Sequence, residues 1–173
     1  MFRSTVLFVL ALTLALTACA PKSAPAAAPV SGEKFDVSRF TGTYEGTWTN
    51  EKTGAGGPVI ITIQADESAK LVNMTLDFGG NYLGLSDPPA VTLTAPYDDN
   101  GATVTGNSVL FGDMDVRIDA NGNIIGNFKN LAGGTIPAMT YTGRIGDGRL
   151  DADYVITLPD GTTATALLRT ERK

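Results

Sequence analysis

Alternation of apolar and polar side chains is the feature that most constrains the fold of this chain. Between Arg149 and Leu158, apolar residues occupy every second position, and charged residues fill several of the positions between them. The same alternation occurs over residues 70–78 and 113–120. Because successive side chains of a strand point to opposite faces, this period of two predicts antiparallel sheet with one buried and one hydrated face. Within residues 40–173, no stretch keeps helical spacing over several turns.

Ten strands are predicted from this alternation and from the turn residues between the runs. They are 41–49, 59–65, 70–78, 90–96, 102–110, 113–120, 123–129, 135–144, 149–158 and 162–170. Asn-Gly and Asp-Gly pairs indicate tight hairpins, since Asn and Gly tolerate positive φ. A long meander removes its edges by closing, so the sequence predicts an all-β fold, an antiparallel up-and-down β-barrel of about 8–10 strands. A sandwich of two sheets is the alternative.

The lengths of the connections predict two different barrel ends, because alternate connections of a meander lie at the same end. The long connections are 50–58, 79–89 and 130–134, and all three fall at one end. We therefore expect an open mouth with long loops there and a closed end with short turns opposite. The closed end is expected to be acidic and to gather Asp66, Glu67, Asp98, Asp99, Asp119 and Asp147.

The N-terminal residues have a different composition from the rest of the chain. Arg3 precedes a predominantly apolar run at 6–16. A run of about eleven residues suits the core of a signal peptide and is shorter than the roughly 20 residues of a membrane-spanning helix. It leads into Leu-Thr-Ala-Cys at 16–19, which contains the sole cysteine. Residues 20–34 are rich in Pro and Ala and are predicted to be an extended spacer, and residues 35–40 are predicted to form a short turn or helix that packs on the domain; together with Cys19, residues 20–39 are the expected tether.

The LTAC sequence at 16–19 resembles the lipobox of bacterial lipoproteins. The resemblance implies that residues 1–18 are a lipoprotein signal peptide, that Cys19 carries a diacylglycerol, and that 19–39 tethers a domain at 40–173 to a membrane. By resemblance to Gram-negative lipoproteins, Ala20 after the cysteine implies the outer membrane, on either its periplasmic or its surface face. Since the first strand starts at the closed end, we expect the mouth to point away from the membrane.

Several classes of chemistry have no basis in the composition. The chain has no histidine and a formal net charge of −5, and it contains no nucleophile elbow or phosphate-binding loop. The carboxylate pairs Asp113/Asp115 and Asp151/Asp153 lie on predicted hydrated faces. The segment 119–123 matches the first half of a calcium loop, but a hairpin explains all of its residues. We expect no enzymatic activity, no metal, no cofactor and no nucleic-acid partner.

Aromatic residues are the candidates for a binding site. Those expected to point into the barrel or to its rim are Tyr44, Trp48, Phe78, Tyr82, Phe128, Tyr141 and Tyr154. In a hollow barrel such residues line a pocket in which apolar walls supply affinity and hydroxyls orient the ligand. In a filled barrel they are core residues. The sequence leaves both interpretations open.

The segment FTGTYEGTW at 40–48 is similar to the opening strand of calycins, the lipocalin and fatty-acid-binding barrels. That resemblance implies that Trp48 closes the barrel floor, although Tyr44 holds the position nearest to Gly42. Residues 141–173 resemble the closing hairpins of small bacterial lipocalin-like lipoproteins. Together these resemblances imply a membrane-anchored envelope lipoprotein that binds a small apolar ligand. The alternative is a structural or interaction lipoprotein with a filled barrel that contacts another envelope protein, and surface lipoprotein barrels of the transferrin-binding type are related to it.

Overall fold

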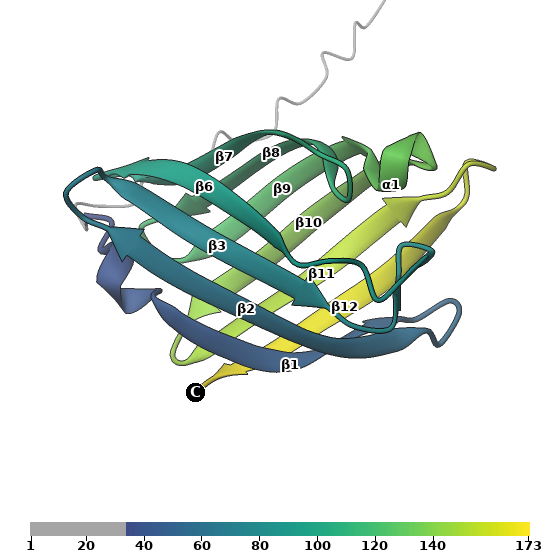
Figure 1. The fold of residues 1–173 in the computed structure, drawn as a ribbon, viewed down its shortest axis with the longest axis horizontal. Coiled ribbons are helices and arrows are strands. Elements are labelled where there is room, and N and C mark those ends of the chain that lie inside the picture. The colour runs from purple at the N-terminus through teal and green to yellow at the C-terminus, as the bar shows by residue number, and fades with distance from the viewer. Residues whose placement is uncertain (1–33) are drawn as a thin grey trace, which may run out of the picture. The chain divides into compact units, whose positions relative to one another are not determined.

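A closed barrel of ten antiparallel strands contains most of residues 34–173, the residues that the computed structural model describes (Figure 1). Its order is β1-β12-β11-β10-β9-β8-β7-β6-β3-β2. The barrel strands are β1 (Gly42–Asn50), β2 (Gly56–Asp66), β3 (Leu71–Phe78), β6 (Val91–Asp98), β7 (Gly101–Ser108), β8 (Gly112–Asp119), β9 (Asn123–Asn130), β10 (Ile136–Gly146), β11 (Arg149–Thr157) and β12 (Thr163–Arg172). The predicted meander barrel is confirmed, and each predicted strand forms with small shifts at its ends. The predicted signal peptide, Cys19 and most of the tether lie outside the described residues.

The alternation in the sequence decides which side chains enter the core. In β11, Leu150, Tyr154 and Ile156 are buried, whereas Asp153 and Val155 between them are exposed. A slip of one residue against β10 or β12 would turn this whole apolar set toward solvent. Burial of one face therefore fixes the register around the barrel.

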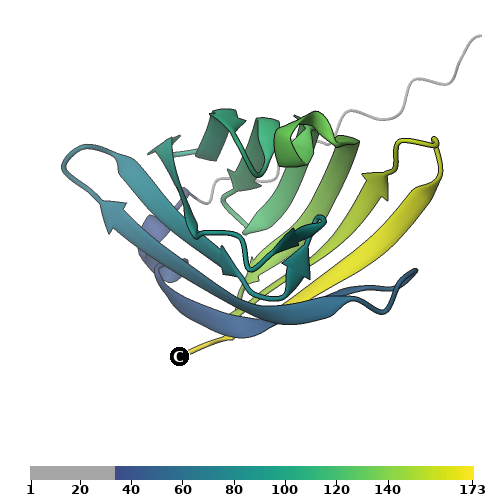
Figure 2. The same ribbon diagram turned by 45° about the vertical axis from the view of Figure 1, so that its right-hand side comes forward.

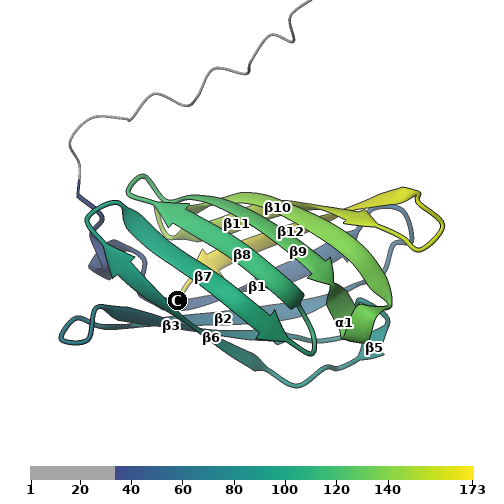
Figure 3. The same cartoon turned by 90° about the horizontal axis from the view of Figure 1, so that it is seen from above.

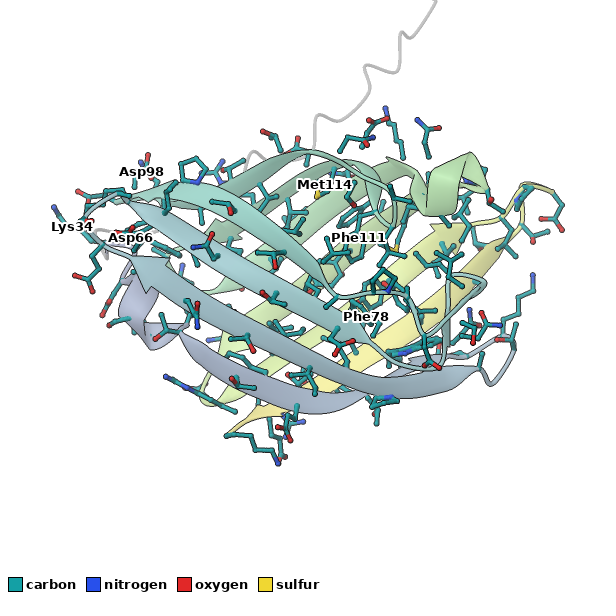
Figure 4. The ribbon with its side chains drawn as sticks, viewed as in Figure 1. Lys34, Asp66, Phe78, Asp98, Phe111 and Met114 are labelled. Atoms are coloured by element: carbon teal, nitrogen blue, oxygen red, sulfur yellow. The ribbon has the colours of Figure 1, made fainter. Side chains whose placement is uncertain are left out.

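The two ends of the barrel differ as the connection lengths predict. The mouth is formed by the connections that follow β1, β3, β7, β9 and β11, and the closed end by the tight turns opposite. Figure 3 shows β5 and α1 at the mouth, far from the turn between β2 and β3. Figure 4 places Asp66 and Asp98 at the closed end together with Lys34, which pairs with Asp99 at 2.7 Å. The closed end therefore carries cations as well as the expected carboxylates.

A short 3₁₀ helix, η1 (Val37–Arg39), covers the closed end. Phe35 and Phe40 on its two sides are buried, with ring centroids 5.3 Å apart, and the Phe35 amide donates to the Asp99 carbonyl at 2.9 Å. Tyr44 completes this floor by donating its hydroxyl to the Phe40 carbonyl at 3.0 Å. The short turn or helix predicted at residues 35–40 is thus confirmed, and the core begins at Phe35, earlier than the predicted domain boundary at residue 40.

The other helical element is α1 (Leu131–Gly134), a single turn between β9 and β10. In the part of the chain that the structure describes, no helix is long and apolar enough to cross a membrane.

Backbone pairing around the barrel is weakest between β6 and β7, a site we call the β6–β7 seam. These strands pair at Tyr97↔Ala102 and Asp98↔Gly101, next to their turn, whereas β6 and β3 pair from Leu71↔Pro96 to Leu76↔Val91. The Tyr97 N–H donates to the carbonyl of Lys70, just before β3, at 3.0 Å. Because successive backbone N–H groups of a strand point to opposite sides, the nitrogen of the preceding residue faces β7. That residue is Pro96, which has no N–H to donate. The ladder therefore stops where proline removes a donor.

Candidate ligand-binding site

A pocket of about 470 Å³ opens at the barrel mouth. We call it the mouth pocket. Its walls come from the inner faces of β1, β10, β11 and β12 and from the loops around them. Most of the wall is apolar and includes Trp48, Leu83, Ile136, Ile156 and Leu158. A few polar side chains, Asn50, Thr53, Asn81 and Thr135, stand at the rim.

A second cavity, of about 60 Å³, lies deeper in the barrel and is called the inner cavity here. Phe78, Phe111 and Phe128 contribute to its wall, as do Leu93 of β6 and Val104 of β7 beside the β6–β7 seam. Figure 4 shows Phe78 and Phe111 inside the barrel on the side of the mouth. The inner cavity shares three wall residues with the mouth pocket, Tyr82, Met139 and Tyr154. These three side chains are the partition between two adjoining chambers.

A small hairpin of β4 (Asn81–Tyr82) and β5 (Leu85–Ser86) carries Tyr82 into this partition. In Figure 2 the teal hairpin lies between the walls of the barrel. The base of the hairpin is fixed by two 2.7 Å bonds, Gly80 N–H to Asp87 Oδ1 and Asp87 N–H to the Gly80 carbonyl. Its turn uses positive φ at Leu83 and Gly84. Because strands of two residues carry no periodicity, the sequence predicts a loop here and gives no sign of the hairpin.

Aromatic contacts hold the Tyr82 ring at the inner end of the mouth pocket. The ring stacks on Phe78 with centroids 4.0 Å apart and is nearly perpendicular to the Trp48 ring, with centroids 5.1 Å apart. Trp48 Nε1 donates to the Gly79 carbonyl at 2.9 Å, which joins β1 to the start of the hairpin loop. The expectation that Trp48 closes the floor is therefore wrong. Since β1 runs from the closed end to the mouth, its last residues lie at the mouth, and Phe40 and Tyr44 close the floor instead.

Three tyrosine hydroxyls are the main polar groups of the interior, and we call Tyr82, Tyr141 and Tyr154 the tyrosine cluster. Tyr141 and Tyr154 face each other across β10 and β11, with ring centroids 4.9 Å apart. The Tyr82 hydroxyl is buried and has no hydrogen-bond partner among the described residues. Burial raises the pKa of all three hydroxyls well above the ordinary value of tyrosine. They therefore remain protonated donors near neutral pH.

The electrostatic character of both chambers is uniform. Among the described residues, no charged side chain lines either the mouth pocket or the inner cavity. No group of His, Cys, Asp or Glu side chains in residues 34–173 is arranged to hold a metal ion. The site therefore offers apolar contact and hydrogen bonds from hydroxyls and amides.

The structure distributes the predicted site residues over three places. Phe78, Phe128 and the tyrosine cluster line the inner cavity, and Trp48 lines the mouth pocket. Tyr44 belongs to the floor and lines neither chamber. Sequence reasoning missed Met139 and Leu83. Met139 is two positions before Tyr141 on the same face of β10, so the alternation could have found it, whereas Leu83 sits in the β4–β5 turn and has no such signal.

Comparison with known proteins returns no match, either to a protein-family model or to a curated protein. The functional interpretation of the barrel therefore depends on the geometry of the two chambers.

Proposed function

We propose that this protein is a lipid-anchored lipoprotein of the bacterial envelope whose barrel binds a small apolar molecule. The observation that carries the proposal is the mouth pocket. Its volume of about 470 Å³ lies within the roughly 300–1,000 Å³ typical of ligand sites. Its apolar walls, with a few polar groups at defined places, are the usual composition of such sites.

The mouth pocket is the chamber with room for a ligand in the described conformation. The inner cavity of about 60 Å³ is several-fold smaller than the roughly 300–1,000 Å³ typical of ligand sites, so it is too small for a lipid in this conformation. Tyr82 stands between the chambers and belongs to a hairpin rather than to the barrel wall. Movement of this hairpin would join the inner cavity to the mouth pocket.

Anchoring through Cys19 is supported by the lipobox-like sequence before it and by the place where the described chain enters the barrel. Lys34 and Phe35 lie at the closed end, opposite the mouth pocket. Residues 20–33 can span at most about 50 Å when fully extended. This arrangement favours a mouth that points away from an outer membrane holding the acyl chains. Replacement of Cys19→Ser tests the anchor, and the full chain is expected to move from the membrane fraction to the soluble fraction.

Binding is tested through Trp48, the sole tryptophan of the chain. Full-length protein carrying Cys19→Ser is titrated with N-phenyl-1-naphthylamine, an uncharged apolar fluorophore, while Trp48 emission is followed. We expect a saturable change, because Trp48 lines the mouth pocket. Leu158→Gln, which places an amide in the pocket wall, should weaken binding several-fold. Val155→Gln is the matched control, since Val155 is exposed on the outer face of β11.

The alternative function, a structural lipoprotein with a filled barrel, is favoured by the small volume of the inner cavity. It predicts no saturable change in Trp48 emission. The exposed large aliphatic residues are spread over the barrel and its loops, at Ile60, Leu85, Val109, Ile125 and Val155. Single exposed residues of this kind are ordinary on protein surfaces and do not mark a docking patch. A flat titration would overturn ligand binding and leave this alternative.

A further inference from the structure

We propose that the ligand carries an uncharged oxygen, as in an ester, an amide or an alcohol, and that the tyrosine cluster donates hydrogen bonds to it. This inference rests on the proposed function and specifies the ligand class of the same site. It excludes a free carboxylate as the preferred ligand group. Three features of the interior support it: an unpaired hydroxyl, the convergence of the cluster, and the lack of a lining charge.

The first feature is the Tyr82 hydroxyl. The Tyr82 side chain is 4% exposed, and its hydroxyl has no partner among the described residues. Buried polar groups in native proteins are nearly always hydrogen-bonded, because an unpaired one destabilises the folded state. A hydroxyl whose partner is a bound molecule accounts for this exception.

The second feature is the convergence of the cluster from three elements. Tyr82 comes from β4, Tyr141 from β10 and Tyr154 from β11, and all three line the inner cavity. Tyr154 and Tyr82 also line the mouth pocket. The Tyr154 hydroxyl is near enough to that of Tyr82 to lower the pKa of Tyr82 as a hydrogen-bonding neighbour, and Tyr141 raises the same pKa through its charge, but no hydrogen bond of ordinary length joins the Tyr82 hydroxyl to either. The donors therefore gather at the partition, where one ligand oxygen could meet more than one of them.

The third feature is the charge of the surroundings. The chain has no histidine, and among the described residues no lysine or arginine lines either chamber. On the outer face of β11 and β12, Arg169 pairs with Asp153 at 2.7 Å and Arg149 pairs with Asp151 at 3.2 Å. A carboxylate at the cluster would be desolvated without a countercharge, which is strongly unfavourable. An uncharged oxygen accepts the same hydrogen bonds without that penalty.

A pair of fluorescent probes that differ in charge tests the inference. The full chain carrying Cys19→Ser is titrated at pH 8 with cis-parinaric acid and with its methyl ester. We expect the ester to bind at least about tenfold more tightly. The difference should narrow as the pH falls, because burial raises the pKa of the carboxyl group and the protonated acid is neutral.

Matched tyrosine variants locate the contact. Tyr154→Phe is expected to weaken binding of the ester about threefold to tenfold, the loss of one neutral hydrogen bond. Tyr141→Phe provides a second, independent variant of the cluster. Tyr97→Phe is the control, since Tyr97 packs on Phe35 at the closed end and lines neither chamber, and it should leave the affinity unchanged.

The outcomes separate this inference from the proposed function. Binding of the acid at pH 8 as tight as that of the ester would overturn the uncharged-ligand inference while supporting a binding barrel. Unchanged ester affinity in both Tyr154→Phe and Tyr141→Phe would overturn the role of the cluster. No saturable binding of either probe would overturn the proposed function and the inference together.

Discussion

Replacement of Tyr82 by phenylalanine is expected to stabilise the protein in the absence of ligand. The substitution keeps the ring, whose centroid lies 4.0 Å from that of Phe78 and 5.1 Å from that of Trp48. It removes a buried hydroxyl that has no partner among the described residues. The folded state therefore loses an unfavourable desolvation and keeps its apolar contacts.

The size of the effect follows from the penalty for an unpaired buried hydroxyl. Such a group destabilises a folded protein by about 1–3 kcal/mol, so Tyr82→Phe should raise the free energy of unfolding by about 1 kcal/mol or more. In a domain of this size, 1 kcal/mol corresponds to a rise in Tm of about 2–6 °C. Urea unfolding followed by Trp48 emission measures the free energy, and a thermal melt measures Tm.

The matched control is the same substitution at Tyr44. The Tyr44 hydroxyl is also buried but donates to the Phe40 carbonyl at 3.0 Å, so Tyr44→Phe should lower the free energy of unfolding by about 1 kcal/mol. Opposite signs for the two variants are the expected result. A loss of stability in Tyr82→Phe as large as that in Tyr44→Phe would show that the Tyr82 hydroxyl is paired in the free protein, with the neighbouring Tyr154 hydroxyl as its nearest partner, and the argument for a ligand partner would fail.

Three further predictions concern the turns, the tyrosine cluster and the barrel wall. Gly122→Ala should lower the free energy of unfolding by at least about 3 kcal/mol in a urea titration, because φ is +79° and an added Cβ would lie 1.9 Å from the Ile145 carbonyl oxygen. The control is Gly161→Ala, where φ is +80° but no atom lies within 4 Å of an added Cβ, and it should lower the free energy of unfolding by only about 1–2 kcal/mol. The hydroxyls of the tyrosine cluster have pKa values raised above that of unfolded tyrosine, about 10, so their contribution to stability is complete below that pH and is lost as the pH rises beyond it. Tyrosinate absorbance should therefore appear together with the loss of circular dichroism. Amides of β6 and β7 should exchange with deuterium faster than those of β11 and β12, and equal protection would contradict the weak β6–β7 seam.

The barrel itself was predictable because its information is local and repeated. Each strand carries its own alternation, and most tight turns carry residues that tolerate positive φ, such as Gly122 at +79° and Gly161 at +80°; the β2–β3 turn, with positive φ at Lys70, is an exception. Closure then follows from the need to pair the first and last strands, which meet from Tyr44↔Arg172 to Asn50↔Ala166. No single long-range contact had to be guessed.

The sequence analysis did not predict the weak pairing at the β6–β7 seam, although one residue indicates it. Pro96 ends the predicted strand 90–96, and a proline within a strand indicates an edge where the N–H side has no partner. In the structure β6 continues to Asp98, and its pairing with β7 is confined to the residues after the proline. A proline inside a strand of a closed barrel therefore predicts where the wall is weakly paired.

The prediction that Trp48 closes the floor was wrong because it followed the resemblance to calycins rather than the direction of the first strand. The meander places the start of the first strand at the closed end, so residues late in that strand must lie at the mouth. Tyr44, four positions earlier, is correspondingly in the floor and outside both chambers. The connection lengths alone contained this information, whereas the β4–β5 hairpin depends on a loop conformation with positive φ at Leu83 and Asp87 that no periodicity reveals.

The position of the tyrosine cluster predicts the orientation of the proposed ligand in the barrel. Its oxygen would sit at the partition, between a chamber of about 60 Å³ and one of about 470 Å³. The apolar body then has room only on the side of the mouth, against Trp48 and Ile156, because Tyr82 and Phe78 block the other side. The ligand would therefore enter polar end first and leave its apolar end near the loops. A lipid held this way keeps its tail against the apolar wall of the mouth pocket, at the end of the barrel opposite Lys34, where the described chain begins.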